Sequence, residues 1–261
     1  MRTTAIQNFK GGTGKTVTTI NLAAELLSRG KRVVLIDADP QQNLTGFFGV
    51  TPEAGRTLYE LLTAQHEPYY PDWVTNVREG LTLVPASMDL ILADVRALRD
   101  NTARLTAIRE LVECMAEDDF ADVCLIDCPA YLTASSSAAL VAADDVIIPI
   151  RVDAFSLGGM EELMQQINIM RIFNPWLRVS GALVTMDRNG TVISREAKEA
   201  LRQSAVPVYG ATITFTEAVT QSLSLRKPLR EMSARYAKIA AADYAAVCDE
   251  YLEGGAKYGQ F

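Results

Sequence analysis

The stretch Phe9-Lys-Gly-Gly-Thr-Gly-Lys-Thr16 decides how the rest of this 261-residue sequence is interpreted. It follows a short segment, residues 3–8, that is typical of a β-strand, and it precedes apolar positions that recur at helical spacing up to Gly30. Glycines let a backbone turn tightly and point its N–H groups inward, and the following helix adds the positive end of its dipole. This stretch therefore predicts a loop that binds phosphate groups between a strand and a helix.

The two lysines of the loop receive different roles. Lys15 would reach the terminal phosphates, and the Thr16 hydroxyl would ligate Mg²⁺. Lys10 lies outside the glycines, where it is either a solvated surface lysine or a group that reaches the phosphates of a partner subunit. The common form of the motif has glycine where this chain has Phe9, so this is a variant with an additional lysine. The predicted nucleotide-binding residues here are Lys10, Gly11, Gly12, Thr13, Gly14, Lys15, Thr16 and Val17.

Further strands and helices alternate along the chain. Apolar runs at 32–37, 81–85, 123–127, 146–150 and 179–185 are continuous, which is typical of strands covered on both faces. Helical patterns occupy 88–98, 102–117, 133–143, 156–173, 191–204 and 234–253. The alternation predicts an α/β fold with a doubly wound, mostly parallel sheet flanked by helices. We expect a single domain over residues 1–254, with an irregular insertion or loop region at 51–80 and a loose C-terminal tail at 255–261.

Composition excludes several classes of protein. Residues are 49% hydrophobic and 22% charged, with a net charge of −7, which is ordinary globular usage. The longest uncharged run, 128–143, is too short and polar to span a bilayer, and no signal peptide is apparent, so a cytoplasmic protein without membrane contact is expected. A single histidine and four cysteines without a CxxC pair disfavour histidine triads and metal centres built on these residues.

Acidic residues close two of the predicted strands, next to the predicted phosphate loop. Asp37 and Asp39 close the second strand, and alternate strand residues share a face, so both carboxylates can lie beside the phosphate loop. Asp127 closes the run Val123-Cys-Leu-Ile-Asp127, an arrangement in which the carboxylate receives a Mg²⁺-bound water. Each acid alone could be a helix cap or a solvated loop acid. Together they predict a metal site made of Thr16, Asp39 and Asp127, with Asp39 also positioning the attacking water.

In combination these motifs resemble those of ParA-type partition ATPases, in the deviant-Walker group of P-loop NTPases that includes MinD and the nitrogenase iron protein. The stretches that carry the resemblance are Lys10-Gly-Gly-Thr-Gly-Lys-Thr16, Asp37-Ala-Asp-Pro-Gln-Gln-Asn43 and Leu125-Ile-Asp-Cys-Pro129, and it extends over nearly the whole chain outside 51–80. The resemblance implies an ATPase that uses ATP and Mg²⁺ and turns over slowly without a partner. It also implies that Met186 and Asp187 help to hold the adenine.

The family's cycle implies three partners. ATP binding closes a homodimer in which Lys10 crosses to the other subunit, the dimer binds DNA without sequence preference, and a ParB-type protein stimulates hydrolysis. Basic residues gather between 187 and 238, and a nucleoid-associated protein would use such a surface. However, at two positions where the family usually has basic residues that contact DNA, this chain has Phe215 and Ala218. The remaining candidates for DNA contact are Arg188, Arg195, Arg226, Lys227 and Arg230.

Other functions are compatible with parts of this pattern. A related ATPase could position a protein cargo, with weak or absent DNA binding. A membrane-cycling ATPase would need a basic amphipathic C-terminal helix, whereas residues 244–261 carry three acids and one lysine. An iron–sulfur protein would need cysteines at a subunit seam, and a tyrosine kinase of this fold would need a tyrosine-rich tail.

Overall fold

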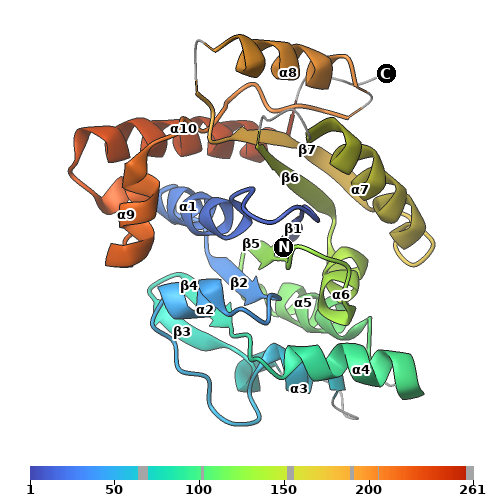
Figure 1. The fold of residues 1–261 in the computed structure, drawn as a ribbon. Coiled ribbons are helices and arrows are strands. Elements are labelled where there is room, and N and C mark those ends of the chain that lie inside the picture. Colours follow the sequence, from blue (N-terminus) through green and yellow to red (C-terminus); the bar gives the residue numbers. More distant parts are fainter. Residues whose placement is uncertain (64–69, 101–102, 152–155, 189–190, 205, 257–261) are drawn as a thin grey trace.

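A seven-stranded sheet forms the centre of the protein, as the computed structural model in Figure 1 shows. The structure describes residues 1–261 apart from 64–69, 101–102, 152–155, 189–190, 205 and 257–261. The strand order is β3-β4-β2-β5-β1-β6-β7, and every neighbouring pair is parallel except the antiparallel pair β3–β4. The strands are β1 (Arg2–Ile6), β2 (Val33–Asp37), β3 (Thr75–Arg78), β4 (Leu81–Val84), β5 (Val123–Asp127), β6 (Asp145–Arg151) and β7 (Arg178–Thr185).

Helices cover both faces of this sheet because successive strand residues point to opposite sides. Val34 and Ile36 of β2 join one apolar cluster, and Val33 and Leu35 join the other. The first cluster is completed by α3 (Leu58–Thr63), α4 (Leu90–Asp100), α5 (Ala107–Glu117), α6 (Ala134–Ala142) and α7 (Ser156–Met170). The second is completed by α1 (Lys15–Ser28), α2 (Asn43–Phe47), α9 (Glu217–Leu225) and α10 (Arg235–Leu252).

The predicted doubly wound, mostly parallel fold with a single domain is confirmed. Each predicted strand begins and ends within about two residues of an observed strand. The apolar run that ends at Asp37, for example, is β2. Helix α8 (Val192–Arg202) also lies where a helix was predicted. Among the described residues, no helix is both long and apolar enough to cross a membrane.

Two segments differ from the sequence-based expectations. The region 51–80 contributes α3, a short 3₁₀ helix at Tyr70–Asp72 and the edge strand β3, so its described part belongs to the central sheet and its cover. The expected loose tail is wrong for Gly255 and Ala256, because the Ala256 N–H donates to the Ser180 oxygen at 2.8 Å and its side chain is buried. The rest of that tail, 257–261, lies outside the described residues.

The central strands end together. Asp37 of β2 pairs in register with Asp127 of β5, and Ile6 of β1 pairs with Asp127 as well. The loop after β1 and the ends of β2 and β5 therefore meet at one edge of the sheet, which is where open α/β sheets bind their ligands.

Candidate functional site

The loop between β1 and α1 has the conformation that its glycines predict. Gly12 and Gly14 have φ angles of 71° and 89°, which side-chain-bearing residues rarely adopt. Gly14 immediately precedes α1, so the first N–H groups of this helix point into the loop. The Thr13 oxygen accepts a hydrogen bond from the Thr185 hydroxyl at 2.8 Å, which fixes the loop to the end of β7.

Lys15 lies inside the loop, as predicted. Its Nζ donates to the backbone oxygen of Asn8 at 3.0 Å and to that of Lys10 at 3.4 Å. Burial lowers the pKa of this ammonium group, and the charge of Asp127 partly opposes that change. The Asn8 side chain accepts from the Lys10 N–H at 2.9 Å and thereby closes the turn. A cation held at the centre of inward N–H groups is suited to binding phosphate.

The two strand-end acids are buried in different ways. Asp37 accepts hydrogen bonds from the Thr45 N–H and hydroxyl at 2.8 and 2.7 Å, and burial nevertheless raises its pKa to about 6. Asp127 contacts Thr19 at 3.5 Å and is bonded by Thr16, but its Oδ2 has no hydrogen-bond partner among the described residues. Burial and the nearby charge of Asp37 raise the pKa of Asp127 well above its ordinary value.

An unpartnered buried carboxylate oxygen beside a threonine hydroxyl is the feature that a nucleotide-bound magnesium ion would satisfy. Within the described residues, no group of three or more His, Cys, Asp or Glu side chains could hold a metal by itself. Mg²⁺ usually keeps several waters and binds through one or two carboxylates plus substrate phosphates. Thr16 and Asp127 therefore fit a magnesium ion that arrives with phosphate ligands.

The other two predicted catalytic residues lie at the rim of the loop. Asp39 is partly buried, and its Oδ1 accepts the Gln41 N–H at 2.9 Å, so this oxygen caps its own turn. The charge of Asp39 acts on both Lys15 and Asp127, and its place in the metal site stays a prediction. The Lys10 side chain is exposed, while its backbone oxygen accepts from Lys15 Nζ.

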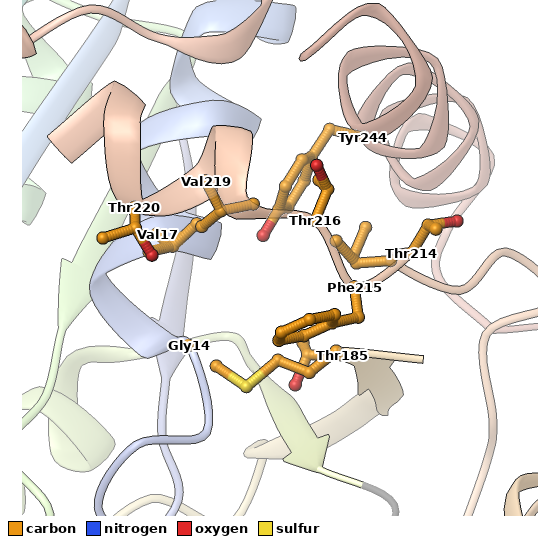
Figure 2. A pocket seen from close by; sticks show the side chains of 11 residues that line it. Gly14, Val17, Thr185, Thr214, Phe215, Thr216, Val219, Thr220 and Tyr244 are labelled. Atoms are coloured by element: carbon orange, nitrogen blue, oxygen red, sulfur yellow. The ribbon is translucent and has the colours of Figure 1, made fainter. Parts of the chain in front are cut away.

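An open hollow of about 430 Å³ lies next to the phosphate loop and is lined in part by Gly14 (Figure 2). Met186, predicted to contact the adenine, lines this hollow. Asp187 does not, because its buried carboxylate accepts from Ser194 at 2.6 Å, from Thr212 at 3.0 Å and from Lys198. The Asp187 side chain therefore holds α8 and the segment before Ile213 together, and a contact of this residue with the adenine stays a prediction.

Sequence reasoning missed most of the hollow. Its walls come from α1, the end of β7, the segment 213–216, α9 and α10, which are distant in sequence. The residues not predicted are Thr185, Ile213, Thr214, Phe215, Thr216, Val219, Thr220 and Tyr244. Of these residues, Phe215 is the one that the sequence could have indicated as part of a binding site. It is an aromatic residue in a polar segment, at a position where the family that the sequence resembles has arginine.

The predicted DNA-contact residues fall into two segments, one at and before α8 and one directly after α9. The Arg188 guanidinium lies 4.6 Å from the centre of the Phe215 ring, and Arg230 pairs with Glu25 at 3.0 Å. Arg195 is exposed on α8. Arg226 and Lys227 are exposed just after α9.

The fold and the site together define a P-loop NTPase. The defining features are a mostly parallel sheet, a glycine loop before a helix, a buried lysine and paired strand-end acids.

Residues 1–179 match the family model described as an AAA domain. The chain is 35% identical over 232 residues to the chromosome partitioning protein ParA of Caulobacter vibrioides, covering 88% of this chain and 86% of that one. It is 38% identical over 203 residues to the chromosome-partitioning ATPase Soj of Thermus thermophilus, covering 77% and 76%. The chain belongs to the ParA/Soj family of partition ATPases.

A solved structure agrees with this assignment. The cobyrinic acid a,c-diamide synthase of Mycobacterium smegmatis with bound ADP and magnesium superposes with a TM-score of 0.80 at 29% identity. The match covers 100% of this chain and 99% of that one. The ligands of that protein agree with the prediction of ATP and Mg²⁺ as cofactors.

Proposed function

We propose that this chain is a DNA partition ATPase that binds MgATP, closes into a homodimer around two nucleotides and hydrolyses ATP slowly until a ParB-type protein stimulates it. The observation that carries the MgATP part of this proposal is the unpartnered Asp127 Oδ2, buried beside Thr16 and the Lys15 loop. Leaving such a buried oxygen without a partner is costly, and a bound cation would supply that partner. The partition function is supported by the similarity to ParA of Caulobacter vibrioides and Soj of Thermus thermophilus.

The chain's own residues divide the work in this proposal. The loop N–H groups and Lys15 bind and orient the phosphates, which is most of what phosphoryl transfer requires of a protein. Bound Mg²⁺ supplies charge neutralisation at the phosphates. Asp39, whose Oδ1 accepts the Gln41 N–H, orients the attacking water with its carboxylate. Lys10, exposed at the rim, adds its charge to the partner subunit's nucleotide.

A second function has an observation in its favour. Ala218 is buried in the first turn of α9, and Phe215 lines the hollow, so neither position offers a basic contact to DNA. Arg230 is engaged with Glu25. An ATPase of the same family that positions a protein cargo, with little DNA binding, would need no more basic surface than this.

The two lysines of the loop provide a matched test of the proposed cycle. For Lys15→Ala we expect loss of ATP binding, because the central cation of the phosphate site is removed. For Lys10→Ala we expect ATP binding to remain within a few-fold, while ATP-dependent dimerisation and hydrolysis are lost. Calorimetry measures binding, and sedimentation with and without MgATP measures dimerisation. Normal dimerisation and hydrolysis in Lys10→Ala would rule out the cross-subunit role.

A further inference from the structure

The hollow beside Gly14 has one large aromatic wall. Figure 2 shows the Phe215 ring on one side of this space, with Val17 and Val219 across from it. Phe215 is 47% exposed, although burying such a ring is favourable. An exposed aromatic face that lines a hollow continuous with a phosphate loop is suited to a flat, aromatic ligand group.

Arg188 holds this ring from outside the hollow. Its guanidinium lies 4.6 Å from the ring centre, within the range of a cation–π contact. Arg188 does not line the hollow, so it covers the ring without occupying the space that a ligand would fill. The ring therefore contacts Arg188 and also lines the open hollow.

The backbone around Phe215 is fixed independently of the ring. The Phe215 N–H donates to the Asp187 oxygen at 2.9 Å, and the Asp187 N–H donates to the Ile213 oxygen at 2.8 Å. The carboxylate of Asp187 is anchored in turn by Ser194, Thr212 and Lys198. Because these bonds do not involve the Phe215 side chain, the ring can be removed without removing the wall that presents it.

We propose that Phe215 selects the base of the bound nucleotide by stacking its ring on a purine, and that Arg188 is a positioning residue that keeps the ring in place. Every base can stack on an aromatic ring, but a purine is larger than a pyrimidine and therefore covers more of the ring's apolar surface. The inference rests on the proposed ATP site and assigns its base specificity to a residue outside the phosphate motifs.

The test compares nucleotides with a probe that has no base. Binding of ADP, UDP and inorganic tripolyphosphate is measured by calorimetry on the full chain, in wild type, Phe215→Ala, Phe215→Tyr and Arg188→Ala. Phe173→Ala is the matched control, because Phe173 is 55% exposed and does not line the hollow. Melting temperatures of all variants show whether each is folded.

For Phe215→Ala we expect ADP affinity to fall about 10- to 100-fold, which is the usual effect of removing a base-stacking aromatic. Tripolyphosphate affinity stays within about twofold, and the preference for ADP over UDP disappears. Phe215→Tyr and Phe173→Ala stay near wild type, and Arg188→Ala weakens ADP about threefold without affecting tripolyphosphate.

Several results would overturn the assignment. Unchanged ADP binding in Phe215→Ala, or equal weakening of ADP and tripolyphosphate, would show that the ring does not contact the base. Unchanged ADP binding in Arg188→Ala would remove the positioning role. If wild type binds tripolyphosphate but the variants do not alter ADP binding, only this inference fails. If wild type binds neither ADP nor tripolyphosphate, the proposed function fails together with this inference.

Discussion

Asp127 carries a cost that its place in the site explains. Its carboxylate is fully buried, and one oxygen lacks a partner among the described residues. Burial and the charge of Asp37 both raise its pKa, so the ionised form is less favourable in the folded protein than in the unfolded chain. An oxygen kept ready for a cation therefore lowers the stability of the nucleotide-free protein.

This cost predicts the behaviour of Asp127→Asn. Without nucleotide at neutral pH, we expect the variant to melt a few degrees above wild type, because about 1 kcal/mol corresponds to about 2–4 °C in a domain of this size. When the pKa of a carboxyl group is higher in the folded protein than in the unfolded chain, the group destabilises the folded protein at pH values above its folded-state pKa. At pH values below its unfolded-state pKa, the group is protonated in both states and this loss of stability is absent. The difference should therefore shrink as the pH falls through the raised pKa of Asp127.

Scanning calorimetry at a series of pH values measures this difference. The same variant should lose the stabilisation that MgATP gives to wild type. A variant less stable than wild type at neutral pH, or a difference that does not depend on pH, would contradict the account of this carboxylate.

Helix α2 depends on a single polar anchor. The Thr45 hydroxyl donates to Asp37 at 2.7 Å and accepts the Ala86 N–H at 3.1 Å, so it joins the ends of β2 and β4. All of these atoms are buried. The anchor holds Asp37 and the turn that carries Asp39 against the sheet.

For Thr45→Val, which keeps the shape and removes the hydroxyl, we expect a loss of about 1–3 kcal/mol, because a buried donor and acceptor lose their partner. Urea unfolding measures the loss. Thr63→Val is the matched control: its hydroxyl donates to the Tyr59 oxygen at 2.8 Å within its own helix, and its loss should be below about 0.5 kcal/mol. Equal losses in the two variants would remove the anchoring role.

The elements that sequence reasoning identified are those with long or punctuated signals. The strand ending at Asp127 and the glycine loop before Lys15 are local patterns, so the positions of both in the fold could be predicted from the sequence. Edge strand β3 and the short helices α2 and α3 carry too few residues for a periodic pattern. The hollow could not be predicted, since its walls come from segments distant in sequence that the fold brings together, for example through the pairing of Asp187 with Thr214 after β7.

At the scale of the whole molecule, a partly buried network around Arg2 joins β1 to β6 and to α10. Arg2 bonds Asp145 at 2.6 Å and also donates to the Tyr251 oxygen, with its guanidinium 3.8 Å from the centre of the Tyr251 ring. Thr4 bonds both Asp145 and the Tyr251 hydroxyl at 2.8 Å. This network lies at the amino ends of β1 and β6, away from the phosphate loop.

Arg2→Met should therefore destabilise the protein by about 3 kcal/mol without changing ADP affinity, because it leaves the buried Asp145 without its main partner. Arg178→Met is the control. Arg178 also approaches Asp145, at 3.9 Å, but its side chain is 72% exposed, so its loss should cost under about 0.5 kcal/mol. Urea unfolding and calorimetry measure the two quantities. A weakened ADP affinity in Arg2→Met would contradict the separation of the two ends.

In the proposed function, this ATPase acts on DNA through its ATP-bound dimer. Binding to non-specific duplex DNA is measured with ATP, with ADP and without nucleotide across a salt series. We predict binding with ATP alone, weakening steeply as salt rises, because contacts to phosphates dominate. ATP-driven dimerisation without DNA binding in any state would contradict it and favour a protein cargo.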